Sequence, residues 1–525
     1  MENPPKSSTQ RSYLDWLWYI LALSLIIFVG ALNLYFPFVA DHVVPLTAAK
    51  TIAAGGTIYV DFWDNKMPGL FWFYFVAGEL FGYTEFGVHM LDLIWMSIFS
   101  LILMFSLRDY LIYPWLSALA TVAVVGVYYV SVELFLLTQL EALVWLPIYL
   151  SLLCGLSRVE NPHRVKTLFF LSGIFAGVTV VFKLIFAPLF VVFWLILSWH
   201  LLRTKRFDLV TAVTNLWVPV SCGVVSVLGL VVYHFWSKDA LGELLWTAFE
   251  YPPRALDQSQ PAPYLRLFES TRFFVTYFSP WAGFALYVCW RWWKSKEGLM
   301  TSLLIAWAIV CIVVILVQRF SWWPYHFLLL YAPVGILSAR GFAIFIQSLS
   351  ESGGQRLRSP MKLSAFLAIP LLGAVMIAGK QKFSPYTAVM LEKPGTVEEL
   401  QVALNFRYHV FRQNSRFLND EAALPGKIYV FGNPLYYHLS GREPALPIIG
   451  WPWEYFLQSQ WQQIPQQLDE ARPPYIYIDE KNQHMMELRG AGVAEFIQSR
   501  YARLLKDEQG QWYILKPKYR LRAGI

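Results

Sequence analysis

Charged residues are scarce in this chain of 525 residues: they make up 15% of it, whereas soluble domains carry roughly a quarter. Hydrophobic residues make up 57%, and the mean hydropathy is +0.44. A water-soluble fold of this composition would leave large apolar patches exposed, so an ordinary soluble enzyme is excluded. The remaining class is a protein that crosses the membrane many times.

Cysteine is scarce too, and the outward-facing loops and the C-terminal tail contain none. A disulfide framework outside the membrane is therefore excluded. The cysteines present lie far apart within apolar runs and show no metal-ligand spacing, so we interpret them as buried thiols. They are Cys154, Cys222, Cys289 and Cys311.

Long apolar runs are abundant. Each is long enough to cross about 30 Å of hydrocarbon, which takes roughly 20 helical residues. The first run is too long for a signal-peptide core and no small-residue cleavage site follows it, so we expect it to be retained. The sequence predicts a polytopic α-helical membrane protein with about eleven transmembrane helices. They cover residues 16–36, 88–107, 113–131, 139–157, 167–182, 184–202, 211–236, 271–290, 299–318, 325–346 and 363–379.

Basic residues fix the expected orientation. If these spans alternate, the basic clusters all fall on the side of the N-terminus, which is cytoplasmic by the positive-inside rule. They account for most of the net charge of +7, so we expect no nucleic-acid partner. The segment 69–83 is apolar but short, and we expect it to lie along or dip into the interface rather than cross it. We therefore predict an inner-membrane protein.

Two domains follow from the fall in hydropathy after residue 379. Residues 1–379 form the membrane domain, with a first extracytoplasmic loop at 37–87, and residues 380–525 form a small extracytoplasmic α/β domain. Within the second domain the patterns predict strands in "KIYVFG" and "PYIYID", a helix in "VAEFIQSRY" and a hairpin in "RLLKDEQGQWYIL".

Charge gathers in the first outer loop, "FPFVADHVVPLTAAKTIAAGGTIYVDFWDNKMPG". It contains Asp41, Asp61, Asp64 and Lys66, and Glu141 reaches the same surface at the start of the fourth span. A carboxylate near hydrocarbon costs several kcal/mol unless it faces water or a partner. A shared cavity at the outer surface is therefore geometrically possible.

The same stretch resembles a family. An acid after the first span, the pattern A-x-x-I-x-x-G-G-x-x-Y-x-D-x-W-D-x-K-x-P, an acid near the fourth span and a lysine between the fifth and sixth are similar to the GT-C glycosyltransferases. The resemblance is to bacterial relatives of protein O-mannosyltransferases and lipid A aminoarabinose transferases. "IYVDFWDNKMPG" matches their Y-x-D-x-x-x-x-K-P-P except that Met67 replaces the first proline, and His42 stands where many relatives have glutamate.

The resemblance implies an inverting membrane glycosyltransferase of GT-C type. It would move a sugar from a polyprenyl-phosphate donor to an envelope glycolipid, glycan or protein at the outer face. Asp41 would be the catalytic base that activates the acceptor hydroxyl. The expected ligands of the donor phosphate are Lys66, Lys183 and Arg319. The expected positioning residues are His42, Asp64, Glu141, Tyr325 and His326. No cofactor and no metal are predicted, although oligosaccharyl relatives use a divalent ion.

Each of these residues also has a structural interpretation. Asp41 can cap the next helix, Asp64 can hold a turn, and Glu141 can complement the positive end of a helix. Lys66 and Lys183 can extend to lipid headgroups. The stretch around residues 319–326 is also typical of an interfacial aromatic belt.

Two other functions stay open. A transporter or flippase of lipid-linked sugars would commonly show paired repeats and charges near the bilayer midplane, and the sequence has no apparent repeat. A noncatalytic scaffold could use the aromatic pieces of the tail as a contact surface. The glycosyltransferase accounts for more of the charged loop than either.

Overall fold

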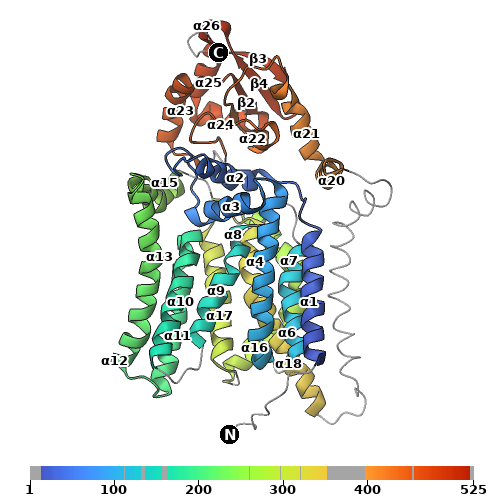
Figure 1. Ribbon diagram of the computed structural model, residues 1–525, viewed down its shortest axis with the longest axis vertical. Coiled ribbons are helices and arrows are strands. Elements are labelled where there is room, and N and C mark those ends of the chain that lie inside the picture. Colours follow the sequence, from blue (N-terminus) through green and yellow to red (C-terminus); the bar gives the residue numbers. More distant parts are fainter. Residues whose placement is uncertain are drawn as a thin grey trace.

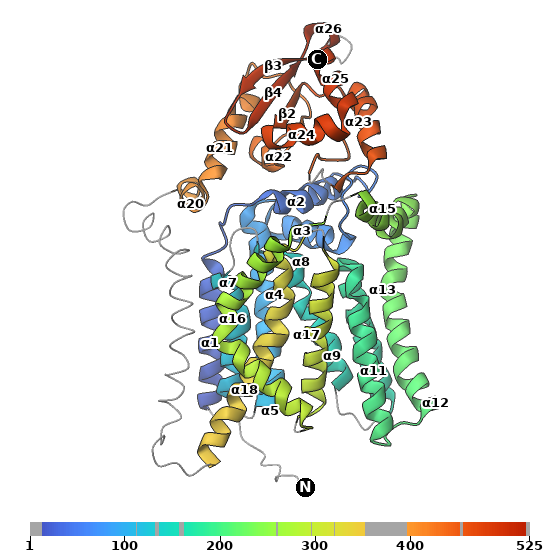
Figure 2. The same cartoon turned by 180° about the vertical axis from the view of Figure 1, so that it is seen from behind.

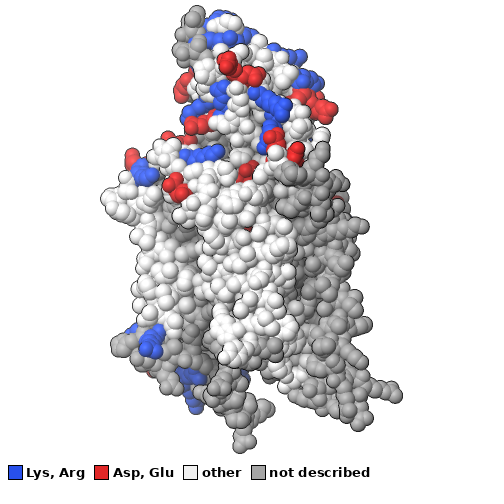
Figure 3. Space-filling view, turned by 45° about the vertical axis from the view of Figure 1, so that its right-hand side comes forward, with Lys and Arg blue, Asp and Glu red and all other residues white. Residues whose placement is uncertain are grey.

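The computed structural model describes residues 13–111, 113–131, 136–156, 162–258, 261–295, 297–319, 321–351, 396–451 and 455–520. A bundle of long helices carries the C-terminal domain on one end, and the first residues of α1 lie at the other end (Figures 1 and 2). On the face seen in Figure 3, a wide band without charged side chains separates those at the two ends. This is the surface expected of a bundle embedded in lipid.

The bundle contains a described helix in each of the first ten predicted spans; the eleventh, 363–379, lies outside the described residues. Its elements are α1 (Tyr13–Ala31), α4 (Glu85–Ser106), α5 (Arg108–Leu111), α6 (Pro114–Thr121), η1 (Val122–Gly126), α7 (Val127–Ser131), α8 (Leu140–Leu143), α9 (Trp145–Leu156), α10 (Pro162–Phe182), η3 (Leu184–Phe186), α11 (Ala187–Arg203), α12 (Leu209–Ala212), η4 (Val213–Trp217), α13 (Val218–Trp236), α16 (Tyr264–Trp293), α17 (Leu299–Val317), η6 (Pro324–Phe327) and α18 (Leu328–Glu351).

Length and composition support membrane spans within the described ranges. Six helices there are long and apolar enough to cross, or seven if the two halves of the bent α16 form one span. Three shorter apolar helices, Asp15–Ala31, Pro114–Val130 and Leu140–Leu156, pack beside them. Helices suit this environment because their backbone groups are satisfied within each segment.

Short helices cover the end of the bundle below the C-terminal domain. α2 (Ala40–Ala53) and α3 (Pro68–Phe81) lie across this end, between the long helices and the domain (Figures 1 and 2). α3 begins at a proline, whose missing N–H costs nothing in the first turn. The apolar segment 69–83 therefore lies across the end of the bundle and does not run along the long helices. At one side of this end lie α14 (Leu241–Leu245), η5 (Trp246–Glu250) and α15 (Tyr251–Gln258).

The C-terminal domain is a four-stranded sheet flanked by helices. Strand order is β1-β2-β4-β3; β1 runs parallel to β2, and the other pairs are antiparallel. Both predicted strands, the helix and the hairpin are present. The elements are α20 (Val397–Leu404), α21 (Phe406–Ser415), η8 (Arg416–Asn419), β1 (Tyr429–Phe431), α22 (Leu435–Ser440), α23 (Gln458–Ala471), β2 (Tyr475–Asp479), α24 (Glu480–Arg489), α25 (Ala491–Arg500), β3 (Tyr501–Lys506), β4 (Gly510–Leu515) and α26 (Pro517–Arg520).

Specific contacts fasten this domain to the bundle. The backbone N–H of Trp63 donates to the carbonyl of Pro447 at 2.9 Å. Glu85, at the start of α4, accepts hydrogen bonds from the Tyr408 hydroxyl and, at 2.9 Å, from His438 Nε2. The first loop is therefore held between the bundle and the domain.

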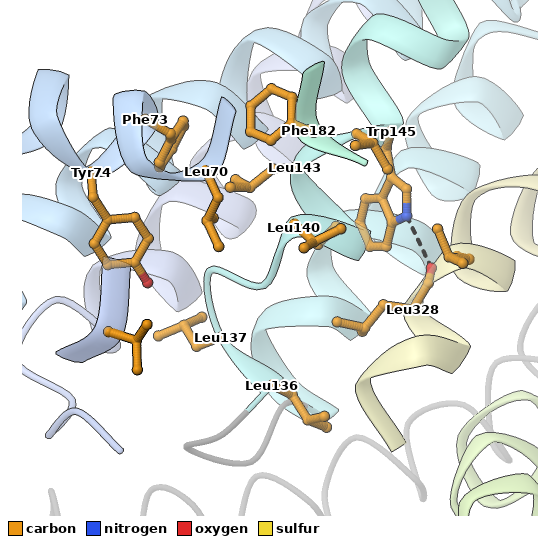
Figure 4. Packing of buried hydrophobic residues seen from close by; sticks show 14 of the residues in the cluster. Leu70, Phe73, Tyr74, Leu136, Leu137, Leu140, Leu143, Trp145, Phe182 and Leu328 are labelled. Carbon is orange, nitrogen blue, oxygen red and sulfur yellow. Dashed lines mark hydrogen bonds between the residues drawn. The ribbon is translucent and has the colours of Figure 1, made fainter. Parts of the chain in front are cut away.

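A continuous hydrophobic core underlies this end of the bundle. Leu70 and Tyr74 of α3, Leu137, and Leu140 of α8 are among its buried members (Figure 4). The indole of Trp145 donates to the carbonyl of Leu328 at 2.9 Å, which links α9 to α18. The segments that carry the charged side chains at this end therefore pack against a close-packed apolar core.

Candidate active site

Charged side chains from five segments meet at the end of the bundle that faces the C-terminal domain. The segments are the start of α2, the loop before α3, the start of α8, the break between α10 and η3, and η6 with the turn before it. Asp41 lies in the first turn of α2, ten residues after α1 ends at Ala31, so it belongs to the helix that covers the end of the bundle and not to the first span. α1 stops at Ala31 because the next residues form turns.

Asp64 and Lys66 form a tight local pair. Asp64 Oδ1 accepts from the Lys66 backbone N–H at 3.0 Å and from Lys66 Nζ at 3.2 Å. The Tyr59 hydroxyl donates to the Lys66 carbonyl at 2.7 Å. The Asp64 side chain is 3% exposed and that of Lys66 is 21% exposed, so the ammonium is held in place yet reachable.

Electrostatics connect Asp41 to this pair. Burial acts to lower the pKa of the Lys66 ammonium, but the charges of Asp64, Asp41 and Glu141 outweigh it and raise the pKa above its usual 10.5. Asp41 also acts electrostatically on Tyr325 and His326. The carboxylate of Asp41 and the ammonium of Lys66 therefore belong to one electrostatic neighbourhood, in which Lys66 stays charged.

Glu141 is the centre of a second cluster. Its side chain is 1% exposed, and Oε1 accepts from Lys183 Nζ at 3.0 Å and from His326 Nδ1 at 3.2 Å. Lys183 Nζ also donates to Gln318 Oε1 at 2.7 Å. Among the described residues no hydrogen-bond partner reaches Glu141 Oε2. A buried carboxylate persists only with such compensation, so Lys183 keeps Glu141 ionised.

A close backbone contact brings the two lysine-bearing segments together. Gly69, three residues after Lys66, lies against the end of α10, just before Lys183. A Cβ at Gly69 would lie 2.8 Å from the carbonyl oxygen of Val181 and 2.9 Å from the Phe182 nitrogen. Only glycine fits here, and the two ammonium groups are thereby carried on adjoining segments.

His42 uses both ring nitrogens on backbone groups. Nδ1 accepts from the Val39 N–H at 3.2 Å, and Nε2 lies 2.6 Å from the Leu137 carbonyl, to which it donates. Burial lowers the pKa of the imidazole below its usual 6.5. The ring thus fixes the start of α2 as a neutral group, and its expected part in positioning the acceptor remains a prediction.

The remaining predicted residues lie in η6 and in the turn before it. Tyr325 is half-buried, with its ring centroid 4.5 Å from that of His326. Arg319 is exposed, and its carbonyl accepts from the Ala262 N–H at 2.9 Å. The expected roles of Arg319 in binding the donor phosphate and of Tyr325 in positioning the substrate remain predictions.

An apolar groove of about 460 Å³ opens beside the lysines, between α3, α4, α10 and α13. Gly69 and Phe182 line it, so it begins next to the segments that carry Lys66 and Lys183. Its remaining walls are Trp72, Phe73, Val76, Leu91, Trp95, Val178, Val181, Val227, Leu230, Val231 and His234. A hydrocarbon chain is the ligand that suits such a lining.

Sequence reasoning missed several polar partners. Gln318 and Ser321, which contact Lys183 and His326, are uncharged residues in an aromatic turn and carry no periodic signal. Asp92 was detectable, because an acid within an apolar span is a functional signal in itself. It is fully buried in α4 and accepts from the hydroxyls of Tyr128 and Tyr129 at 3.3 and 2.9 Å.

No group of three or more His, Cys, Asp or Glu side chains that could hold a metal ion occurs in the described part of the chain. The Glu141 and His326 pair has Lys183, a cation, as its third member. A metal-free reaction remains a prediction.

Comparison with known proteins identifies the fold. No protein-family model and no curated protein matches the sequence. Among solved structures, ArnT from Cupriavidus metallidurans bound to undecaprenyl phosphate matches 97% of this chain and 99% of its own, with a TM-score of 0.59 and 12% identity. The apo state of the same protein matches 96% and 99%, with a TM-score of 0.59 and 14% identity. The expected GT-C resemblance is confirmed at the level of the fold.

Proposed function

We propose, from this shared fold, that the protein is an inverting glycosyltransferase that moves a sugar from a polyprenyl-phosphate donor to an envelope glycolipid, glycan or protein. The observation that supports the proposal is that Lys66, on which the Asp41 carboxylate acts electrostatically, lies three residues before Gly69 in the wall of an apolar groove. A lipid phosphate suits both features of this site: its anionic phosphate would meet the lysine ammonium groups, and its hydrocarbon chain would lie in the apolar groove. ArnT of the same fold has been seen with such a lipid.

Charge development in the reaction suits the ammonium groups. As the bond between the sugar and the phosphate breaks, negative charge grows on the departing phosphate. A fixed cation stabilises that charge more in the transition state than in the ground state. Lys66, held by Asp64, and Lys183, held by Glu141 and Gln318, would act on the phosphate in this way.

Asp41 would act on the other side of the sugar. A phosphate is already a good leaving group, so the acceptor hydroxyl is the partner that needs help, and a general base typically contributes 10²–10⁴-fold. Attack from the face opposite the phosphate inverts the anomeric carbon. The partly buried carboxylate of Asp41, in the first turn of α2, is the base in this proposal.

The reaction would take place at the extracytoplasmic face of the inner membrane. The proposal places the N-terminus in the cytoplasm and the C-terminal domain outside, which follows the basic loops of the sequence. The donor would reach the site sideways from the bilayer through the groove.

Transfer by purified protein tests the proposal. With a polyprenyl-phosphate sugar as donor and envelope extract as acceptor, we expect sugar transfer by the parent and a loss of about 10²-fold or more in Asp41→Asn. Asp61→Asn is the matched control, because Asp61 is an exposed acid of the same loop whose Oδ2 accepts from the Thr57 N–H. Sugar flux across vesicles without any glycosylated product would instead favour a flippase.

A further inference from the structure

A serine, a histidine and a glutamate form one hydrogen-bonded chain at the edge of the site. Ser321 Oγ lies 2.9 Å from His326 Nε2, and His326 Nδ1 lies 3.2 Å from Glu141 Oε1. Because Glu141 is ionised, Nδ1 carries the proton that it accepts, and Nε2 is left to accept the Ser321 hydroxyl proton. This order, hydroxyl to base to orienting carboxylate, is the signature of an activated hydroxyl.

The turn that presents Ser321 is strained and braced. Trp322 has φ of 44°, a left-handed conformation that a bulky side chain rarely adopts. Two side chains of α16 hold this turn: Arg266 Nη1 donates to the Ser321 carbonyl at 3.3 Å, and Ser270 Oγ donates to the Trp322 carbonyl at 2.7 Å. Strain that the surroundings maintain in this way clusters at functional sites.

Competing partners do not displace this arrangement. The Ser321 hydroxyl has a second acceptor, the Gln318 carbonyl at 3.3 Å, but the contact with His326 is shorter. The charged groups that act on His326 are Glu141, Lys183 and Asp41. The two carboxylates act to favour a charged imidazole, whereas burial and the Lys183 ammonium act against it.

We propose that Ser321, His326 and Glu141 form a proton-accepting relay, with Ser321 as a catalytic residue that touches the acceptor hydroxyl and serves as a second route for its proton beside Asp41. This inference rests on the proposed function for its substrate. It goes beyond that function in assigning Ser321 a role and in giving the transfer two proton acceptors.

The relay conserves atoms and charge. As the acceptor oxygen bonds to the anomeric carbon and the carbon–phosphate oxygen bond breaks, the acceptor proton moves to Ser321 Oγ. The Ser321 proton moves at the same time to His326 Nε2. The products are an imidazolium paired with Glu141 and a departed lipid phosphate, and the imidazolium later returns its proton to water.

A reagent test examines the relay without any sugar donor. A fluorophosphonate probe reacts with an activated serine: the phosphorus–fluorine bond breaks, a bond from Oγ to phosphorus forms, and the proton passes to the histidine. We expect labelling at Ser321 in the detergent-purified full chain, none in Ser321→Ala, and at least about 10-fold less in His326→Gln. Ser338→Ala is the control, because Ser338 Oγ only donates within α18, to Val334.

A kinetic test examines its use in transfer. In the Asp41→Asn background, His326→Gln should lower the residual turnover by a further 10-fold or so while the donor KM changes little. The residual turnover of Asp41→Asn should rise with pH as His326 loses its proton, and that rise should vanish in the double variant. Ser321→Thr, which keeps a hydroxyl, should retain the rise.

The outcomes separate the two proposals. No labelling of Ser321, or labelling that His326→Gln leaves unchanged, overturns the relay whatever the transfer assay shows. Labelling at Ser321 without sugar transfer by the parent overturns the proposed function and leaves the activated serine. Residual turnover of equal size and pH dependence in Asp41→Asn with and without His326→Gln also overturns the relay.

Discussion

Lys183 and Glu141 are joined through Nζ and Oε1 at 3.0 Å, although 42 positions separate them in the chain. The contact ties the end of α10 to the start of α8. It also supplies the counter-charge that lets a buried carboxylate remain ionised next to His326.

Breaking this pair from one side should cost stability. Lys183→Met would leave Glu141 charged and buried, and we expect a loss of roughly 1–3 kcal/mol, less than for a fully buried pair because the Lys183 side chain is 26% exposed. Glu141→Gln added to Lys183→Met should recover part of it. Denaturant unfolding in detergent measures both, and a double variant no more stable than Lys183→Met would contradict the pairing.

Lys66 should matter for the donor more than for the fold. Lys66→Met removes a charge aimed at the phosphate, so kcat/KM for the donor should fall by one to two orders of magnitude. Asp64→Asn, which loosens the ammonium but keeps it, should have a smaller effect. Lys50→Met, an exposed lysine of α2, is the control. Equal activity of the Lys66 and Lys50 variants would remove Lys66 from the site.

The packing of Gly69 predicts that alanine lowers stability at this position but not at an open glycine position elsewhere. Gly69→Ala places a methyl group 2.8 Å from the Val181 carbonyl oxygen, so α3 and α10 must separate and the apparent Tm should drop. Gly229→Ala, in α13, meets nothing within 4 Å and should be neutral or slightly stabilising. Thermal unfolding of the two variants in the same detergent makes the comparison, and a similar Tm would show that the backbones are not in close contact.

His42 predicts a loss of stability in mild acid. Burial lowers its pKa in the folded protein below the unfolded value of 6.5. The unfolded chain therefore binds the proton more readily, and stability falls as the pH drops from about 6.5 to the lowered pKa, with no further loss below it. His42→Asn should be less stable at neutral pH and should flatten this dependence between pH 7.5 and 5.5. An unchanged slope in the variant would assign the effect to other groups.

Sequence patterns predicted those parts of the fold that local chemistry determines. Long apolar runs marked the helices, because a helix must be about 20 apolar residues long to cross the bilayer. Short runs of aromatic and β-branched residues marked β1 and β2, because such residues favour buried strands. The strand order and the docking of Tyr408 and His438 on Glu85 come from contacts between distant segments. No local pattern encodes such contacts.

The residues of the candidate site were likewise predicted only in part. Charged residues such as Lys183 were noticeable in an apolar setting, and the family resemblance singled out His326. Ser321 was not noticeable, because serine is common in turns and its meaning depends on Trp322 adopting a left-handed conformation. Backbone geometry of that kind follows from the braces on α16, which no window of sequence around the turn contains.

The hydrogen bond from Trp63 to the Pro447 carbonyl sets an order of events during synthesis. Several hundred residues separate the two partners. At about 5–20 residues per second, the ribosome needs roughly 20 to 80 s to produce the second after the first. The loop that carries Lys66 is therefore made long before the final domain that locks it, and a chain truncated before residue 447 would assemble its helices while leaving this loop unlocked.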